Sequence, residues 1–296
     1  MFKNILKVML LLAIGAISFV SYAGGPDQWS SDGRPGQTAR VPKDHEFKVC
    51  ADPNNMPYSN DKQEGFENKI AEVLAKDLKK ELSFQFWPDR FGFIRNTIKS
   101  NRCDVIIGTN TTYDALNTTK PYYRAGHVWI YRKDSGYDIK DWNSPDLRKG
   151  IIGIVDKSPV SVSLHANDLM ANAKPYRLMR DLTKDPGQLV THLAEKEIDI
   201  AIMWGPIGGY FAKKSSVPME VVLIPEYSEG NEKLTGKTYW NISAGVRKKD
   251  DERRDMIEAA LIRNKDKIRK ILDDFGVPYT DPVFGDRLDG YKRHKN

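Results

Sequence analysis

One strand–helix pattern occurs twice in this chain, and this repetition limits the fold more than any other feature. Short apolar runs predict strands in the first stretch at residues 47–51, 82–87 and 104–107, with helices from Phe66 and over 93–99. The second stretch repeats this order, with strands at 151–155, 176–179 and 198–203 and helices from Pro159 towards Ala173 and from Pro186. Strands that alternate with helices form parallel sheets covered on both faces. The sequence therefore predicts two β-α-β-α-β units.

Two extended segments connect these units. Residues 127–133 cross from the first unit to the second, and residues 239–247 lead back. A long amphipathic helix follows over about residues 257–272 and ends near Gly276, with Pro278 beyond it. Two lobes joined by two hinge strands form a clamshell of the α/β class. The expected domains are lobe 1 at residues 24–130 and 240–296, and lobe 2 at residues 131–239.

The N-terminal residues predict export. Lys3 and Lys7 precede an apolar run at residues 9–20 that is short for a membrane span, and Ser21-Tyr22-Ala23 has the small residues of a cleavage site. We therefore expect residues 1–23 to be a secretory signal peptide, and the remaining chain to be periplasmic without stable membrane insertion. The 46 Lys and Arg residues are spread among 40 Asp and Glu residues, which argues against a nucleic-acid partner.

The chain has two cysteines, Cys50 and Cys103. Export to an oxidising compartment favours a disulfide between them. Their positions argue the other way, because Cys50 lies late in its predicted strand and Cys103 just before another. Two parallel strands would place them several residues out of register, near or beyond the roughly 7 Å Cα separation that a bridge tolerates. A disulfide and two buried thiols are therefore both open.

Ligands of open parallel sheets collect outside the carboxyl ends of the strands, so the residues that follow each strand are candidate site residues. The segment "CADPNNMPYSN" after the first strand cannot continue a ladder, because of its prolines and asparagines. The cleft between the lobes is expected to be lined by Asp52, Asn54, Tyr58, Glu67, Thr109, Asn110, Ser158, Trp204 and Gly205. Tyr58 and Trp204 are the expected aromatic walls.

Two of these residues have alternative interpretations. Glu67, near a helix start, is either a buried acid or base or a partner for the free N–H groups of the helix terminus. Ser158 either begins a helix whose N–H groups bind an anion or a carbonyl, or is a plain N-cap with Pro159 at the first helical position.

Patterns of catalytic and metal-binding residues are scarce. The five histidines include no pair at metal-ligand spacing, and neither cysteine lies in a C-x-x-C motif. The chain also has no glycine-rich phosphate loop and no serine nucleophile elbow. We expect no metal, no cofactor and no catalytic residues.

Six stretches together resemble a known family: "VCADPNNMPYSN", "GFENKIAEVLA", "GFIRNTI", "RCDVIIGT", "TTKPYYR" and "WGPIGGYFA". Over about residues 45–282 the chain is similar to the family 3 extracellular solute-binding proteins, which have the periplasmic-binding-protein clamshell. Within that family it resembles the MxaJ/XoxJ branch, which is associated with quinoprotein methanol dehydrogenases. The resemblance implies a non-enzymatic periplasmic accessory protein that acts on or with a PQQ-dependent methanol dehydrogenase in its assembly, maturation or activation.

One departure from the family bears on the ligand. Amino-acid-binding relatives carry an arginine shortly after the third strand of lobe 1, where it clamps the ligand carboxylate. Residues 109–119 contain none here, and Arg95 on the preceding helix could substitute only indirectly. This argues against ordinary amino acids and leaves a small molecule or a peptide segment as the cleft ligand. The alternatives are a receptor that delivers a small polar solute to an ABC transporter, and a dehydratase-like enzyme that uses Glu67 and the helix start at Ser158.

Overall fold

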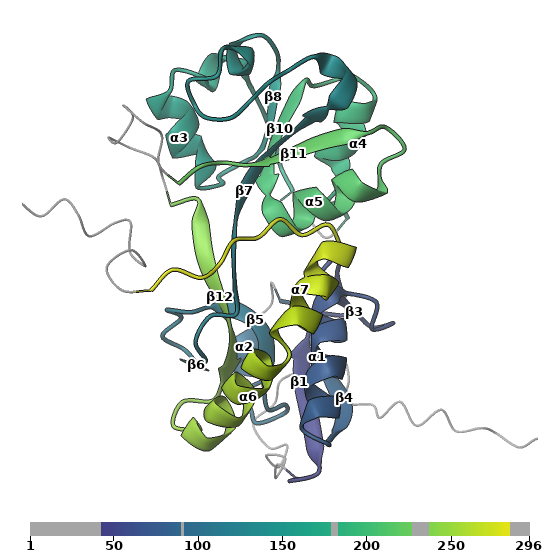
Figure 1. Cartoon of the computed structure of the whole chain (residues 1–296), viewed down its shortest axis with the longest axis vertical. Coiled ribbons are helices and arrows are strands. Elements are labelled where there is room, and N and C mark those ends of the chain that lie inside the picture. Colours follow the sequence, from purple (N-terminus) through teal and green to yellow (C-terminus); the bar gives the residue numbers. More distant parts are fainter. Residues whose placement is uncertain (1–42, 90–91, 179–182, 227–236, 285–296) are drawn as a thin grey trace, which may run out of the picture.

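The computed structural model describes residues 43–89, 92–178, 183–226 and 237–284. The expected signal peptide lies outside these residues. The described chain forms two α/β lobes, one above the other in Figure 1, with β7 running from one into the other. The predicted α/β clamshell is confirmed.

Each lobe has three parallel strands in the same spatial order. In lobe 1, β1 (Glu46–Ala51) pairs with β4 (Glu81–Phe86), and a bridge from Val49 to Val105 brings β5 (Ile106–Asn110) to its other side. In lobe 2 the equivalent strands are β8 (Ile152–Val155), β9 (Ala173–Tyr176) and β10 (Ile200–Trp204). In both lobes the first strand lies between the second and the third, so the two units share one architecture.

Strand β7 (Tyr123–Arg132) belongs to both sheets. Its first half pairs with β12 (Tyr239–Val246), which also pairs with β5 of lobe 1. Its second half pairs with β10 and β11 (Met219–Leu223) of lobe 2. The change of partner lies between Gly126 and His127. We propose this point as the hinge, while the expected lobe boundaries at residues 130 and 239 stay predictions.

The helices cover the sheets from both faces. They are α1 (Phe66–Asp77), α2 (Phe93–Asn96), α3 (Val160–Ala166), α4 (Gln188–Ala194), α5 (Gly205–Lys214), α6 (Asp251–Arg263) and α7 (Lys265–Asp274). In lobe 1, α1, α6 and α7 pack over the sheet through Phe66, Ile70, Leu74, Ile257 and Leu272, all buried. In lobe 2, β7 contributes to two cores, because alternate side chains point to opposite faces: Trp129 to one, Ile130 to the other.

The short elements connect these layers. They are β2 (Asn54–Asn55), β3 (Ser59–Asn60), β6 (Asn117–Thr118) and the 3₁₀ turns η1 (Lys133–Ser135), η2 (Pro145–Arg148) and η3 (Met170–Asn172). Strands β2 and β3 form a small antiparallel ladder directly after β1.

The prediction of one long C-terminal helix was wrong. Asn264 separates α6 from α7, with φ of −107° and ψ of 18° that leave the helical conformation. Its side-chain Nδ2 donates to the carbonyl oxygen of Ala260 at 2.9 Å. An asparagine that bonds to nearby backbone competes with the helical pattern. The predicted end of the second helix at Gly276 is confirmed, since this glycine has a φ of 69°.

The helices α2 and α3 are shorter than predicted, and β9 begins earlier. Helix α3 stops at Ala166 because Asn167 donates its side-chain amide to the Ser163 carbonyl at 2.7 Å and Asp168 has a φ of 56°. Helix α2 stops at Asn96, where Thr97 turns its hydroxyl back to the Phe93 carbonyl at 2.5 Å. Helix α5 and strand β11 were not predicted, and neither were the short elements described above.

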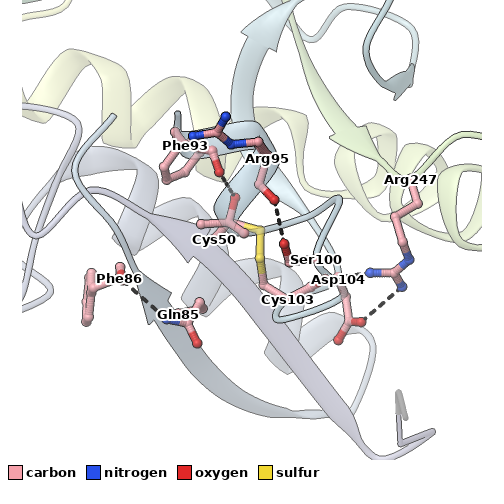
Figure 2. The surroundings of a disulfide bond; sticks show 10 residues. Cys50, Gln85, Phe86, Phe93, Arg95, Ser100, Cys103, Asp104 and Arg247 are labelled. Carbon is pink, nitrogen blue, oxygen red and sulfur yellow. Dashed lines mark hydrogen bonds and ion pairs between the residues drawn. A yellow bond between two sulfur atoms is a disulfide. The ribbon is translucent and has the colours of Figure 1, made fainter. Parts of the chain in front are cut away.

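The sulfur atoms of Cys50 and Cys103 are bonded, and their Cα atoms lie 5.4 Å apart (Figure 2). The register argument for two thiols placed Cys103 directly before a strand beginning at Asp104, whereas β5 begins at Ile106. Cys103 belongs instead to the turn before Val105, where Asp104 N donates to the carbonyl of Lys48 at 2.7 Å. This turn carries Cys103 across to β1. Around the bridge, a small apolar cluster contains Trp87, Phe93, Ile98, Ile106 and Leu116.

We expect the double variant Cys50→Ser/Cys103→Ser to lose about 2–4 kcal/mol of unfolding free energy, because a cross-link restricts the unfolded chain and here joins buried residues 53 positions apart. Urea denaturation of the variant and of the wild type, each with and without reductant, measures the loss. Reductant should destabilise only the wild type. Equal midpoints for wild type and variant under oxidising conditions would contradict the bridge.

Candidate functional site

A hollow of about 450 Å³ lies between the lobes, at the carboxyl end of β1 and beside Ile106 and Gly108 of β5. The lobe 1 wall includes Asp52, Asn54, Tyr58 and Glu67, all named from the sequence. Across from them, lobe 2 contributes Lys184, Pro186, Ile207 and Phe211. We call this hollow the cleft.

Asp52 holds the first strand exit in shape. Its Oδ1 accepts the N–H of Asn54 at 2.8 Å, and its Oδ2 accepts the N–H of Asp89 at 2.7 Å. Its backbone exchanges two further hydrogen bonds with the Ser59 hydroxyl, at 3.1 and 2.8 Å. Each carboxylate oxygen of Asp52 accepts a backbone N–H group, so the Asp52 side chain stabilises the loop that follows β1.

Tyr58 lines the cleft and bonds to Trp204 of lobe 2, which was expected as a cleft wall but is not part of the lining. The Trp204 Nε1–H donates to the Tyr58 hydroxyl oxygen at 2.6 Å, which connects the end of β10 in lobe 2 with lobe 1. The Trp204 ring also contacts His127 and Trp240, with ring centroids 5.5 and 5.3 Å away. Tyr58 packs against Phe66 of the lobe 1 core. Burial raises the pKa of the Tyr58 phenol above its ordinary value, so Tyr58 remains neutral.

Glu67 presents a carboxyl group to the cleft. It is partly buried, and its Oε1 lies so close to Gly108 that a Cβ there would come within 1.9 Å. Burial, and then the nearby charges of Asp89 and Asp52, raise the pKa of Glu67 to about 8. At neutral pH the carboxyl is mostly protonated and can donate a hydrogen bond.

Asn68, rather than the Glu67 side chain, satisfies the start of α1. Its Oδ1 accepts the N–H groups of Gly65 and Asn60, at 3.1 and 3.2 Å. The Glu67 backbone N–H donates to the carbonyl of Tyr58 at 2.9 Å. Of the two interpretations of Glu67, the geometry favours the buried acid.

The other candidate residues lie away from the cleft. Thr109 and Asn110 are the last residues of β5, where they pair with Ser243 and Ile242 of β12. This pairing keeps both residues in the sheet, and neither lines the cleft. Asn110 lines only a small hollow beside Tyr239. Gly205 is buried, with the carbonyl of Gly126 where a Cβ would stand, and serves close packing at the hinge.

Ser158 also lies outside the cleft lining. Helix α3 begins two residues later, at Val160, and Pro159 occupies the cap position. The Ser158 hydroxyl oxygen is buried and has no hydrogen-bond partner among the described residues. Because Ser158 does not line the cleft, the start of α3 does not provide an anion-binding site next to Glu67.

The lobe 2 wall was missed by the sequence analysis. Ile207 and Phe211 lie four residues apart on one face of α5, but the glycines and proline of "WGPIGGYFA" hid this helix. The glycines have a packing role: a Cβ on Gly209 would lie 2.1 Å from the carbonyl oxygen of Gly276. The i, i+4 spacing of Ile207 and Phe211 was the one available signal.

One group in the described part of the chain has the composition of a metal site. Ligand atoms of His192, Glu195 and Glu197 lie within 4.8 Å of one another at the end of α4. The His192 Nδ1 already contacts the Tyr176 hydroxyl at 2.7 Å and a Glu197 oxygen at 3.2 Å. Lys174 pairs with the same Glu197 carboxylate. Contacts within the chain therefore already engage His192 and Glu197 of this group.

Comparison with known families identifies the clamshell. Residues 47–277 match the model of the bacterial extracellular solute-binding proteins, family 3. The chain belongs to this family. Among the described residues, no helix is both long enough and apolar enough to cross a membrane.

Individual family 3 proteins resemble the chain over most of its length. Protein MoxJ of Paracoccus denitrificans is 28% identical over 244 residues, which are 78% of this chain and 88% of that protein. The crystal structure of MxaJ from Methlophaga aminisulfidivorans MPT is 32% identical, with a TM-score of 0.69 over 79% of this chain and all of that one. The periplasmic binding protein XoxJ from Methylobacterium extorquens AM1 is 34% identical, with a TM-score of 0.65 over 80% of this chain and all of that one. The predicted resemblance to the MxaJ/XoxJ branch is confirmed.

We expect Glu67→Gln to stabilise the protein increasingly as the pH rises from about 5 to 8. The folded protein keeps Glu67 protonated up to a pKa of about 8, whereas the unfolded chain ionises near 4.5, so wild-type stability falls through this window. One pKa unit corresponds to about 1.4 kcal/mol, and partial exposure reduces the total gain to a few kcal/mol. Urea denaturation at several pH values measures it, with Glu195→Gln at an exposed carboxylate as the control. A Glu67→Gln effect that is independent of pH would contradict the assignment.

Proposed function

We propose that this chain is a non-enzymatic periplasmic accessory protein of methanol oxidation. It acts on or with a quinoprotein, PQQ-dependent methanol dehydrogenase, in the assembly, maturation or activation of that enzyme. The similarity to MxaJ and XoxJ carries this proposal, at 32% and 34% identity over all of those two chains and 79% and 80% of this one. In the mode of action that we favour, the cleft holds an exposed segment of the dehydrogenase.

The contacts between the lobes favour a segment of a partner protein, rather than a small solute that bridges the lobes, as the occupant of the cleft. The hydrogen bond from Trp204 to Tyr58 joins the two lobes through residues of the chain itself. A second contact lies beside it, where Lys213 of α5 donates to the carbonyl oxygens of Asp273 and Asp274, both at 2.9 Å. These bonds complete the end of α7, whose last carbonyl groups lack helical partners. Contacts within the chain therefore connect the two walls of the cleft.

The lining of the cleft also suits a polypeptide. Ile207, Phe211 and Met56 offer apolar contact, while Asn54 and the protonated Glu67 offer hydrogen-bonding groups. Since Tyr58 and Trp204 bond to each other, we assign the main apolar contact to α5 and give these two aromatic residues the role of holding the walls together. Specific ligand sites commonly combine apolar walls with a few placed polar groups.

The two alternatives have less support. A receptor for amino acids needs a carboxylate clamp, and residues 109–119, which leave β5, contain no arginine. A dehydratase-like enzyme would use Glu67 with the helix start at Ser158, and Ser158 is not among the residues that line the cleft with Glu67.

In a strain that lacks the wild-type gene, we expect the double variant Tyr58→Ala/Trp204→Ala to lower the amount of active methanol dehydrogenase at least severalfold. The reason is that the variant loses the hydrogen bond that connects the two lobes. Dehydrogenase activity in periplasmic extracts measures this, and circular dichroism of the purified variant checks folding. Phe211→Ser tests the wall with the lobe contact intact. The control is Val162→Ala/Ile262→Ala, which alters exposed apolar residues outside the cleft. Full activity with both folded cleft variants would refute the cleft model.

A further inference from the structure

A second hollow of about 330 Å³ lies beside the cleft on lobe 1. We call it the basic groove. It is lined by Asp89, Gly92, Phe93, Ile94, Arg95, Lys99, Tyr113 and Ala115. Asp89 and Phe93 line the cleft as well. The groove and the cleft are therefore neighbours that share a wall, so one extended chain can occupy both.

Two of the three charged side chains that line the groove are cationic. Arg95 and Lys99 are both exposed, lie four residues apart, and have no ion-pair partner among the residues that the structure describes. The third, Asp89, is an exposed carboxylate that interacts within the chain, and its backbone N–H donates to Asp52 Oδ2. Tyr113 adds a large aromatic surface that is 42% exposed.

The adjoining cleft adds one more cation that a ligand could reach. Both carboxylate oxygens of Asp52 accept backbone N–H groups, and Glu67 is mostly protonated. On the opposite wall, Lys184 is exposed and lacks an ion-pair partner in the described part of the chain. The cations of the region are therefore Arg95 and Lys99 in the groove and Lys184 across the cleft.

The groove has a rigid base. Phe93 and Ile98 belong to the apolar cluster that encloses the Cys50–Cys103 disulfide, and Figure 2 shows Phe93 and Arg95 on α2 next to this bridge. The Ser100 hydroxyl donates to the Arg95 carbonyl at 2.5 Å and ties the following turn to α2. Arg95 and Lys99 therefore project from a cross-linked support, which lowers the entropic cost of binding.

We propose that the basic groove docks an acidic stretch of the partner protein, next to the segment that enters the cleft. This inference rests on the proposed function for the identity of the partner, and on charge complementarity for its chemistry. Carboxylates of the partner pair with Arg95 and Lys99, and its apolar or aromatic side chains contact Tyr113. Lys184 receives a further acidic group on the far wall of the cleft.

Binding of the full-length mature protein to purified methanol dehydrogenase, measured by biolayer interferometry at low and high salt, tests the proposal. We expect Arg95→Glu/Lys99→Glu to weaken binding by about tenfold or more at low salt and to reduce its salt dependence. The matched control is Lys248→Glu/Lys265→Glu, which makes the same change of charge at exposed lysines near the starts of α6 and α7. Unchanged binding by the groove variant would overturn the proposal.

A peptide probe separates this proposal from the proposed function. A fluorescein-labelled peptide rich in Glu and Tyr should bind the wild type in fluorescence anisotropy, and a Lys-rich analogue should not. Loss of peptide binding in Arg95→Glu/Lys99→Glu supports the groove even if the dehydrogenase does not bind, which would sink only the proposed function. A thermal shift with inorganic phosphate that needs Arg95 and Lys99, without peptide binding, would identify a small-anion site and overturn the docking proposal.

Discussion

The shared strand β7 is the constraint on which the two-lobed structure depends. All ten of its residues are buried, and its backbone pairs with lobe 1 before Gly126 and with lobe 2 after it. Buried backbone groups need partners, so neither sheet can drop this strand without leaving donors and acceptors unpaired. The shared ladder therefore fixes where the lobes meet, and the residues that follow β1 face α5 across the cleft.

Contacts between the lobes beside β7 then determine what the cleft can do. Trp204 bonds to Tyr58, and Lys213 caps the end of α7, so residues of the chain itself make the connections that a bridging solute would otherwise supply. Arg124 adds a two-bond pair with Glu226, at 2.8 and 2.6 Å, near the point where the chain crosses back. A cleft whose walls are already connected is suited to receiving a segment of a larger partner.

Local patterns in the sequence predicted the repeated units, both hinge strands and the first strand exit, because periodicity and turn residues determine these directly. Tertiary contacts determined the rest. Thr109 and Asn110 follow β12 instead of entering the cleft, and α5 exists despite its glycines because they allow close approach to Gly276. The Cys50–Cys103 bond depends on a turn that a strand-register argument cannot represent. Lys184, on the far wall, has no local signal at all.

Photocross-linking from inside the cleft tests the central claim, that the cleft receives a segment of the dehydrogenase. A photoreactive p-benzoylphenylalanine placed at Phe211 lies on the lobe 2 wall, and the same residue placed at Ile262, which is 65% exposed on α6, reports on an outer surface. After irradiation with methanol dehydrogenase, the account predicts a cross-link from position 211 to one defined dehydrogenase peptide and none from position 262. A cross-link from position 262 alone would contradict it.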